Sequence, residues 1–374
     1  MRIGIDATPM FRERGGVGWY AYHLTTSLAR IDDENTYVLY RDSSSKFPIG
    51  PCINQHNFSS VDVPKWRMRH QVRRDAIEIF HGLNYRLPAY GRYGSVITVH
   101  DLALDRFPHH SRKFFGQRWA SLRARSSFSR ADRLIAVSQH TAHDLCRYYQ
   151  VSSGRIDVVY HGGGLARSTE HTNVALDFLN RHYGFRDGEY ILHVGGGEPR
   201  KNILGLLKAY SMLGDLRQRY QLILVGGMGR WMNQIVREIR HLGLVNDVLI
   251  TGYVAQEHLS AFYKHASLFV YPSLYEGFGI PPLEAMATGI PVIAANTSSL
   301  PEVLGEAAIM VDPLQPAALA QSIRTVLSDP ILREKLREKG LSQVKNFSWE
   351  QAARNTLAVY TSVFLKSYDR RLDN

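Results

Sequence analysis

The segment YPSLYEGFGIPPLEAMATGIPVIA, residues 271–294, decides the fold and carries the strongest functional signal in the chain. Apolar residues at both ends of the segment predict two buried strands, and its middle predicts a loop followed by a helix. Pro281 and Pro282 suit the first turn of that helix, where a backbone N–H is not needed. We therefore expect Glu276 in the loop after the first strand and Glu284 one turn into the helix.

The glycines of this segment indicate what the loop binds. Gly277 and Gly279 should expose backbone N–H groups close to the start of the helix. A phosphate fits such a place, because the N–H groups and the helix dipole both favour an anion. A carboxylate beside that phosphate can accept hydrogen bonds from sugar hydroxyl groups.

Strand and helix patterns alternate on both sides of this segment, which implies parallel strands joined by crossover helices. Sheets of this kind bind ligands at the carboxyl ends of their strands. The expected strands are residues 2–6, 37–40, 77–82, 95–101, 133–138 and 156–163 in the first half of the chain, and 190–197, 220–227, 247–254, 267–273 and 291–296 in the second.

The length of 374 residues predicts two domains. A polar stretch within residues 165–188 separates two runs of alternating strands and helices. We expect an α/β fold with one domain over residues 1–170, a second over 171–350, and a final helix over 351–374 that packs back on the first domain.

A second glycine-rich loop, HVGGGEPRKNILGLL, spans residues 193–207 and lies between a strand and a helix. Arg200 and Lys201 stand directly before that helix, where their side chains can meet a diphosphate lying over the helix start. Gly196 belongs to the same loop. Taken alone, the loop is also compatible with two solvated cations.

The N-terminal segment RERGGVGWY, residues 12–20, is a third glycine-rich loop that leads into a helix. Its spacing is not the dinucleotide fingerprint, so nothing indicates NAD. Gly16 is the candidate for an approach to a phosphate, and a tight turn is an equal alternative.

His100 and Ser138 end strands; each could serve the site or be structural, and Ser138 could cap the helix that follows.

The motif EGFGIPPLEAMATGIPVI resembles the core motif of the family-4 retaining glycosyltransferases, and the resemblance runs along nearly the whole chain. It implies the GT-B fold, with two Rossmann-like domains facing across a cleft. It also implies that residues 1–170 bind the acceptor and residues 171–350 bind a nucleotide-sugar donor.

The resemblance also implies a role for each candidate residue. Glu276 would contact the donor sugar and Glu284 the ribose hydroxyls. Arg200 and Lys201 would hold the donor phosphates, and His100 would lie near the donor sugar. The backbone that would face the sugar and diphosphate comprises Gly16, Gly196, Gly277, Phe278, Gly279 and Ile280.

Two positions depart from the family pattern, and a third is similar to it. Gly196 stands where many members carry an arginine, so that contact is missing. His161 stands where members usually carry an asparagine, which favours a turn between the domains over a catalytic role. His81 resembles a position that borders the acceptor site.

Charge is unevenly distributed, with a formal net charge of +11 for the whole chain. Residues 1–170 hold 24 Lys and Arg against 15 Asp and Glu, and two basic clusters lie at 65–74 and 111–130. The second cluster mixes cations with aromatic residues, which suits either an anionic membrane surface or an ordinary amphipathic helix. Two cysteines, no secretory signal and no long apolar run favour a cytoplasmic protein, peripheral on the inner face of the membrane.

The expected function is transfer of a hexose, with retention of the anomeric configuration, to a glycan or polyprenyl-diphosphate-linked acceptor in cell-surface polysaccharide synthesis. The favoured donor is GDP-mannose, which would make the hexose mannose. No cofactor and no metal are expected, because no Asp-x-Asp pair follows a strand. One alternative is another GT-B nucleotide-sugar enzyme, such as a sugar-phosphate synthase or epimerase, acting on a soluble acceptor. Another is a basic membrane or nucleic-acid binder, although no nucleic-acid-binding motif is found. We expect Glu276→Ala and Lys201→Ala to abolish turnover with little effect on folding, since both residues lie on loops.

Overall fold

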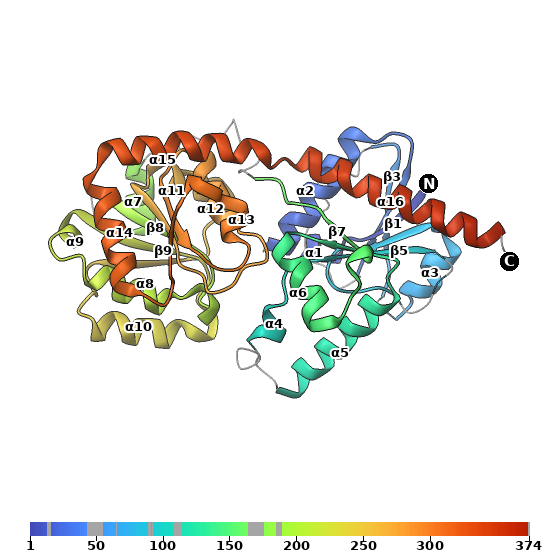
Figure 1. Ribbon diagram of the computed structural model, residues 1–374, viewed down its shortest axis with the longest axis horizontal. Helices are drawn as coiled ribbons and strands as arrows, with labels where there is room; N and C mark the ends of the chain where they lie inside the picture. Colours follow the sequence, from blue (N-terminus) through green and yellow to red (C-terminus); the bar gives the residue numbers. More distant parts are fainter. Residues whose placement is uncertain are drawn as a thin grey trace. The chain divides into compact units, whose positions relative to one another are not determined.

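The computed structural model describes residues 1–12, 16–42, 55–64, 66–88, 91, 93–107, 114–163, 176–184 and 189–372. The chain divides into two compact units, the first formed by Met1–Gly162 with Phe347–Asn374 and the second by Gly163–Asn346. Each unit contains a parallel sheet flanked by helices (Figure 1), which confirms the predicted α/β class. The predicted domain boundary at residue 170 lies outside the described residues.

The first unit is built on a parallel sheet with seven strands in the described part of the chain. Neighbouring strands of this sheet follow the order β3, β2, β1, β4, β5, β6, β7, so the order reverses between β1 and β4. Their bounds are β1 Arg2–Asp6, β2 Thr36–Arg41, β3 Phe58–Asp62, β4 Ile79–Gly82, β5 Gly94–Val99, β6 Arg133–Ala136 and β7 Ile156–Val158.

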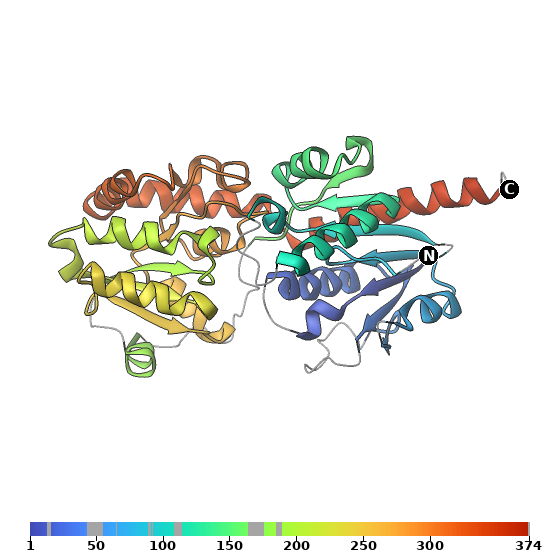
Figure 2. The same ribbon diagram turned by 90° about the horizontal axis from the view of Figure 1, so that it is seen from below.

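The helices of the first unit include the last helix of the chain. Helix α16 packs on α2 and contacts strand β5, and both views show it running along the first unit (Figures 1 and 2). Its Tyr360 and Val363 belong to the same buried cluster as Ile3 and Ile79. The prediction that the C-terminal helix packs on the first domain is therefore confirmed. The helices are α1 Thr8–Arg12, α2 Gly16–Ile31, α3 Met68–Arg74, α4 Ala103–Arg106, α5 Phe114–Arg130, α6 Gln139–Tyr149, η3 Ser153–Arg155 and α16 Trp349–Leu372.

The second unit has a parallel sheet with the strand order β10, β9, β8, β11, β12, β13. Its order reverses between β8 and β11, so the loops after these two strands meet at the carboxyl edge where such sheets bind ligands. The strands are β8 Glu189–Val194, β9 Tyr220–Val225, β10 Val248–Gly252, β11 Leu268–Tyr271, β12 Val292–Ala295 and β13 Ile309–Val311.

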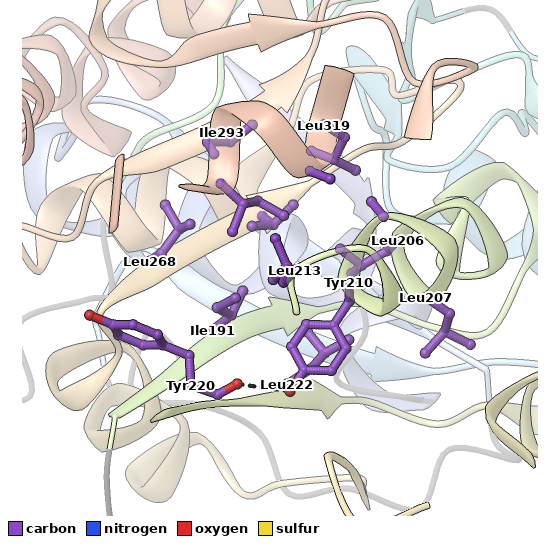
Figure 3. Close-up of a cluster of buried hydrophobic side chains, with 14 of the residues drawn as sticks. Ile191, Leu206, Leu207, Tyr210, Leu213, Tyr220, Leu222, Leu268, Ile293 and Leu319 are labelled. Carbon is purple, nitrogen blue, oxygen red and sulfur yellow. Dashed lines mark hydrogen bonds between the residues drawn. The ribbon is translucent and has the colours of Figure 1, made fainter. Parts of the chain in front are cut away.

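Helices cover the sheet of the second unit and close its core. Tyr210 on α8 donates a hydrogen bond to the carbonyl of Tyr220 (2.8 Å) inside a cluster of buried aliphatic side chains (Figure 3). The helices are α7 Leu176–Tyr183, η4 Pro199–Lys201, α8 Ile203–Ser211, α9 Leu216–Arg219, η5 Gly229–Trp231, α10 Met232–His241, α11 Gln256–His265, α12 Ile280–Ala287, α13 Leu300–Leu304, η6 Gly305–Ala307, α14 Pro316–Ser328, α15 Pro330–Gln343 and η7 Val344–Asn346.

In the described residues, no helix combines the length and the apolar character that crossing a membrane requires.

Candidate active site

Glu276 lies in the loop after β11, and its side chain is only 9% exposed. Its Oε1 accepts hydrogen bonds from Lys201 Nζ (2.7 Å), Tyr271 Oη (3.1 Å) and Ser273 Oγ (2.6 Å). Its Oε2 accepts one from Arg200 Nη1 (3.1 Å). The structure therefore brings together three predicted site residues, Glu276, Arg200 and Lys201, from two different loops.

Hydrogen bonds to the backbone fix the loop that carries Glu276. The Glu276 N–H donates to Ser298 Oγ (2.9 Å), and Ser299 Oγ donates to the carbonyls of Glu276 (3.0 Å) and Phe278 (2.9 Å). The N–H of Leu274 donates to the carbonyl of Arg200 (2.7 Å), which joins this loop to the loop after β8. These bonds hold the Glu276 carboxylate in one place.

The charges in this cluster determine its protonation. Burial alone raises the pKa of Glu276, but the positive charges of Lys201 and Arg200 and their hydrogen bonds lower it to about 2. Burial lowers the pKa of Lys201, and the carboxylate of Glu276 opposes that effect. The ionised cluster thus holds one carboxylate and two cations, which leaves one net positive charge for an anionic ligand.

Helix α12 starts at Ile280, and Gly279 occupies its N-cap position with a φ of 108°, a conformation that favours glycine. Gly277, Phe278 and Gly279 are buried and Ile280 is half-buried. The role of their backbone N–H groups in binding an anion stays a prediction. Helix α13 packs closely against this turn: a Cβ on Gly279 would stand 2.7 Å from Cδ2 of Leu300, the first residue of α13.

Glu284 lies on α12, as predicted, and is half-buried. It accepts a hydrogen bond from Tyr263 Oη (2.9 Å). Removal of the carboxyl from water raises its pKa to about 7, although the Tyr263 hydrogen bond acts in the opposite direction. Glu284 and Glu276 therefore differ in charge state near neutral pH, because only Glu276 has cationic partners.

The loop after β8 approaches the neighbouring backbone closely. The N–H groups of Gly195 and Gly197 donate to the carbonyls of Val225 (2.9 Å) and Gly227 (3.2 Å). A Cβ on Gly197 would stand 2.6 Å from the carbonyl oxygen of Met228, so only glycine fits there. Gly196 is half-buried between them, and the loop ends in the turn η4 that carries Arg200 and Lys201.

His193, near the end of β8, is a residue of this site that the sequence analysis missed. It is fully buried, its Nδ1 lies 2.9 Å from the carbonyl oxygen of Val270, and its ring stacks on Tyr271 at 5.7 Å. Its Nε2 has no hydrogen-bond partner among the residues that the structure describes. Burial lowers its pKa to about 4, so His193 adds a neutral hydrogen-bond acceptor beside the cluster. Its position at a strand end, like that of His100, was the available signal.

The other two predicted residues, Gly16 and His100, belong to the first unit. Gly16 is the exposed first residue of α2, and residues 13–15 before it lie outside the described part of the chain. His100 follows β5, and its Nε2 lies 2.8 Å from the carbonyl oxygen of Leu83. Its ring stacks on His161 at 5.6 Å, and burial lowers the pKa of both histidines.

Two further side chains of the first unit are structural. Ser138 caps α6, because its Oγ accepts a hydrogen bond from the N–H of Thr141 (3.0 Å). His81 is completely buried, with Nδ1 2.7 Å from Tyr360 Oη and Nε2 2.8 Å from Thr98 Oγ1. Both of its ring nitrogens are therefore used within the core, which leaves neither of them for a ligand.

The described residues contain no group of three or more His, Cys, Asp or Glu side chains that could hold a metal ion. Metal independence therefore stays a prediction.

Two family models match the chain, and together they span most of it. The model described as Glycosyltransferase Family 4 matches residues 14–166, and the one described as Glycosyl transferases group 1 matches residues 179–343. The chain belongs to the family-4 glycosyltransferases and is a retaining hexosyltransferase.

Curated relatives agree with this assignment. The O-antigen chain mannosyltransferase B of Escherichia coli is 35% identical over 386 residues, which cover 96% of this chain and 99% of the relative. A serotype-specific mannosyltransferase of Escherichia coli, WbdA, is 33% identical over 248 residues, which cover 65% of this chain and 30% of the relative.

Solved structures support the GT-B fold. A sucrose-phosphate synthase from Thermosynechococcus elongatus superposes with a TM-score of 0.77 at 20% identity, covering 98% of this chain and 100% of that chain. HepE from Anabaena, solved in complex with UDP and glucose, gives a TM-score of 0.72 at 18% identity, covering 96% and 99%. At these identities the likeness establishes the fold alone.

Proposed function

We propose that this enzyme transfers mannose from GDP-mannose to a growing glycan on a polyprenyl diphosphate, in the synthesis of an O-antigen-type polysaccharide. The observation that carries this proposal is the 35% identity to an O-antigen chain mannosyltransferase along nearly the full length of both chains. Family membership supports the nucleotide-sugar donor. The sugar, the base and the acceptor belong to the proposal.

The cluster of the second unit supports a donor site. Arg200 and Lys201 hold the diphosphate, because they are the cations that already bind a carboxylate there. Glu276 accepts hydrogen bonds from the donor sugar, and Glu284 from the ribose hydroxyls. The backbone from Gly277 to Ile280 lies along the donor at the start of α12, with Gly196 on the facing loop.

In the first unit, Gly16 approaches the donor phosphate and His100 contacts a sugar hydroxyl. The Nε2 of His100 takes part in the hydrogen bond with the Leu83 carbonyl, which fixes the direction of the ring. As a neutral ring at neutral pH, it supplies a hydrogen-bonding group and no charge.

The proposed transfer is a front-face substitution. The bond between the anomeric carbon and the phosphate oxygen breaks, and the acceptor oxygen bonds to the same face of that carbon. The acceptor proton passes to an oxygen of the departing diphosphate. Arg200 and Lys201 stabilise the charge that develops on the leaving group, which is the usual electrostatic route to a lower barrier.

An anionic membrane surface is the proposed location of the acceptor. On α3 and the turn before it, buried Met68 and Val72 face inward, whereas Trp66 is 75% exposed and lies under the guanidinium of Arg67 at 4.4 Å. The other exposed basic side chains of this surface are Arg69, His70, Arg73 and Arg74. An exposed aromatic ring among cations suits the headgroup region of an anionic bilayer. Lys65 and residues 111–113 of the predicted basic clusters lie outside the described residues.

A thermal-shift panel with GDP, UDP, ADP, TDP and their sugar conjugates tests the donor. A ligand at 100 times its Kd should stabilise the fold by about 2.7 kcal/mol. We expect GDP and GDP-mannose to give the largest shifts, unchanged by EDTA. Mannose transfer to a lipid-linked acceptor with an α-configured product is then expected. A preference for another base, or transfer only to a soluble acceptor, would contradict the proposal.

A further inference from the structure

In the structure, the two cations proposed for the diphosphate are both bound to a carboxylate of the protein. Lys201 Nζ and Arg200 Nη1 lie 2.7 Å and 3.1 Å from opposite oxygens of Glu276. A carboxylate and a phosphate present the same kind of charged acceptor oxygen to such groups. Glu276 therefore already occupies hydrogen bonds that a phosphate would accept.

Competition follows from the charges and the burial of the cluster. The side chains of Glu276 and Lys201 are about nine-tenths buried, so their charges are weakly screened by water. One carboxylate and two cations leave a single net positive charge, whereas a diphosphate brings at least two negative charges. The diphosphate and the Glu276 carboxylate must then share two cations at close range.

The surroundings of Glu276 allow it to exchange partners. Ser273 Oγ and Tyr271 Oη also donate to its Oε1, so the carboxylate keeps two neutral donors when its bonds to the cations weaken. Lys201 has three N–H groups and gives two of them to Tyr271 Oη and Glu276 Oε1. Both sides of the ion pair therefore have other contacts during an exchange.

We propose that Glu276 competes with the diphosphate for Arg200 and Lys201, so that the enzyme binds a bare diphosphate weakly and the intact donor better. This inference rests on the proposed function and deepens it. An intact donor offers sugar hydroxyls to the displaced carboxylate, whereas a nucleoside diphosphate offers none. After transfer, Glu276 takes the cations back and promotes release of the nucleoside diphosphate.

Binding of inorganic pyrophosphate to the full chain, measured by calorimetry with EDTA present, tests this competition. Pyrophosphate has no nucleobase, so the result does not depend on which nucleotide the enzyme prefers. We expect Glu276→Gln to bind pyrophosphate about tenfold more tightly than the wild type, which corresponds to about 1.4 kcal/mol. The matched control is Glu198→Gln, which removes the same charge from an exposed side chain on the loop that carries Arg200 and Lys201. It should change the affinity less than about twofold, because exposed charges are screened.

A second variant covers the case in which Glu276→Gln does not fold. Glu276→Asp keeps the charge but is one methylene shorter, so it should hold the two cations less well and also bind pyrophosphate more tightly than the wild type. Equal or weaker binding in the folded Glu276 variants would overturn the inference, and so would an equal gain in Glu198→Gln. If the wild type binds no nucleotide sugar and transfers no mannose, the proposed function itself fails.

Discussion

Glu284 should make the stability of the protein depend on pH. Its pKa is raised from 4.5 to about 7 in the folded chain, so the folded state keeps a proton that the unfolded state loses earlier. The contribution of Glu284 to the free energy of unfolding is therefore fully present below about pH 4.5 and is lost as the pH rises through about 7. Urea unfolding between about pH 5 and about pH 8 should show the wild type losing stability relative to Glu284→Gln.

Glu306→Gln is the control for this measurement. Glu306 is an exposed glutamate whose pKa is lowered by its hydrogen bond to Lys339, so it stays ionised over the same range. The difference in the free energy of unfolding between Glu306→Gln and the wild type should not vary with pH. A constant difference for Glu284→Gln as well would show that Glu284 titrates normally in the folded chain.

The burial of Glu276 and Lys201 changes how their substitutions are interpreted. Both residues lie on a loop or a short turn, and from the sequence we expected their alanine variants to fold almost normally. The structure buries the pair, and removing one partner of a buried ion pair costs about 3–5 kcal/mol. Loss of turnover in an alanine variant would therefore combine lost chemistry with lost stability. For this reason the conservative changes Glu276→Gln and Glu276→Asp are the informative ones.

At the scale of elements, the start of α16 depends on a glycine far away in the sequence. A Cβ on Gly162 would stand 2.4 Å from Cγ and Cδ1 of the Trp349 ring and 2.5 Å from the Trp349 backbone nitrogen. The ring also stacks on His23 at 5.0 Å and lies 5.7 Å from His161. The first turn of α16 is thus packed directly on the backbone of the first unit.

We expect Gly162→Ala to destabilise the first unit by about 1–3 kcal/mol, because neither the indole nor the backbone nitrogen can move without losing these contacts. Thermal unfolding followed by tryptophan fluorescence would measure the change. Gly154→Ala is the matched control, since its Cβ would meet nothing closer than Ser152 Oγ at 3.8 Å. The same unfolding temperature for both variants would refute this account of α16.

The elements that the sequence analysis did not predict include the edge strands β3 and β13. Strand β13 has three residues, and β3 is largely polar and partly exposed. Strand β3 lacks the continuous apolar run of a central parallel strand, because an edge strand has one neighbour and is covered less completely. Strand β13 is apolar but too short to stand out as a strand in the sequence. Their place in the sheets follows from parallel pairing with β2 and β12, the strands that precede them in the chain.

At the scale of the whole molecule, the basic surface of α3 should make vesicle binding depend on anionic lipid and on salt. Each cation near such a surface contributes about 1 kcal/mol, so the double variant Arg69→Gln, Arg73→Gln should bind more than about tenfold more weakly. Co-sedimentation with vesicles that contain anionic lipid would measure this. The control, Arg237→Gln with Arg240→Gln, removes two exposed cations from α10 in the second unit. Equal losses in the two variants would mean that net charge, and not the α3 surface, governs binding.

The sequence by itself determined the α/β class, the alternation of strands and helices, and the two loops whose side chains form the cluster. It could do so because these signals are local: a glycine–proline frame, apolar runs, and charged residues at strand ends. Only the tertiary structure decided that Glu276 is buried and ionised beside Arg200 and Lys201, the latter 75 residues away in the sequence. It also decided that the pKa of Glu284 is raised to about 7. Burial and protonation depend on neighbours that come from other parts of the chain, and no local pattern contains them.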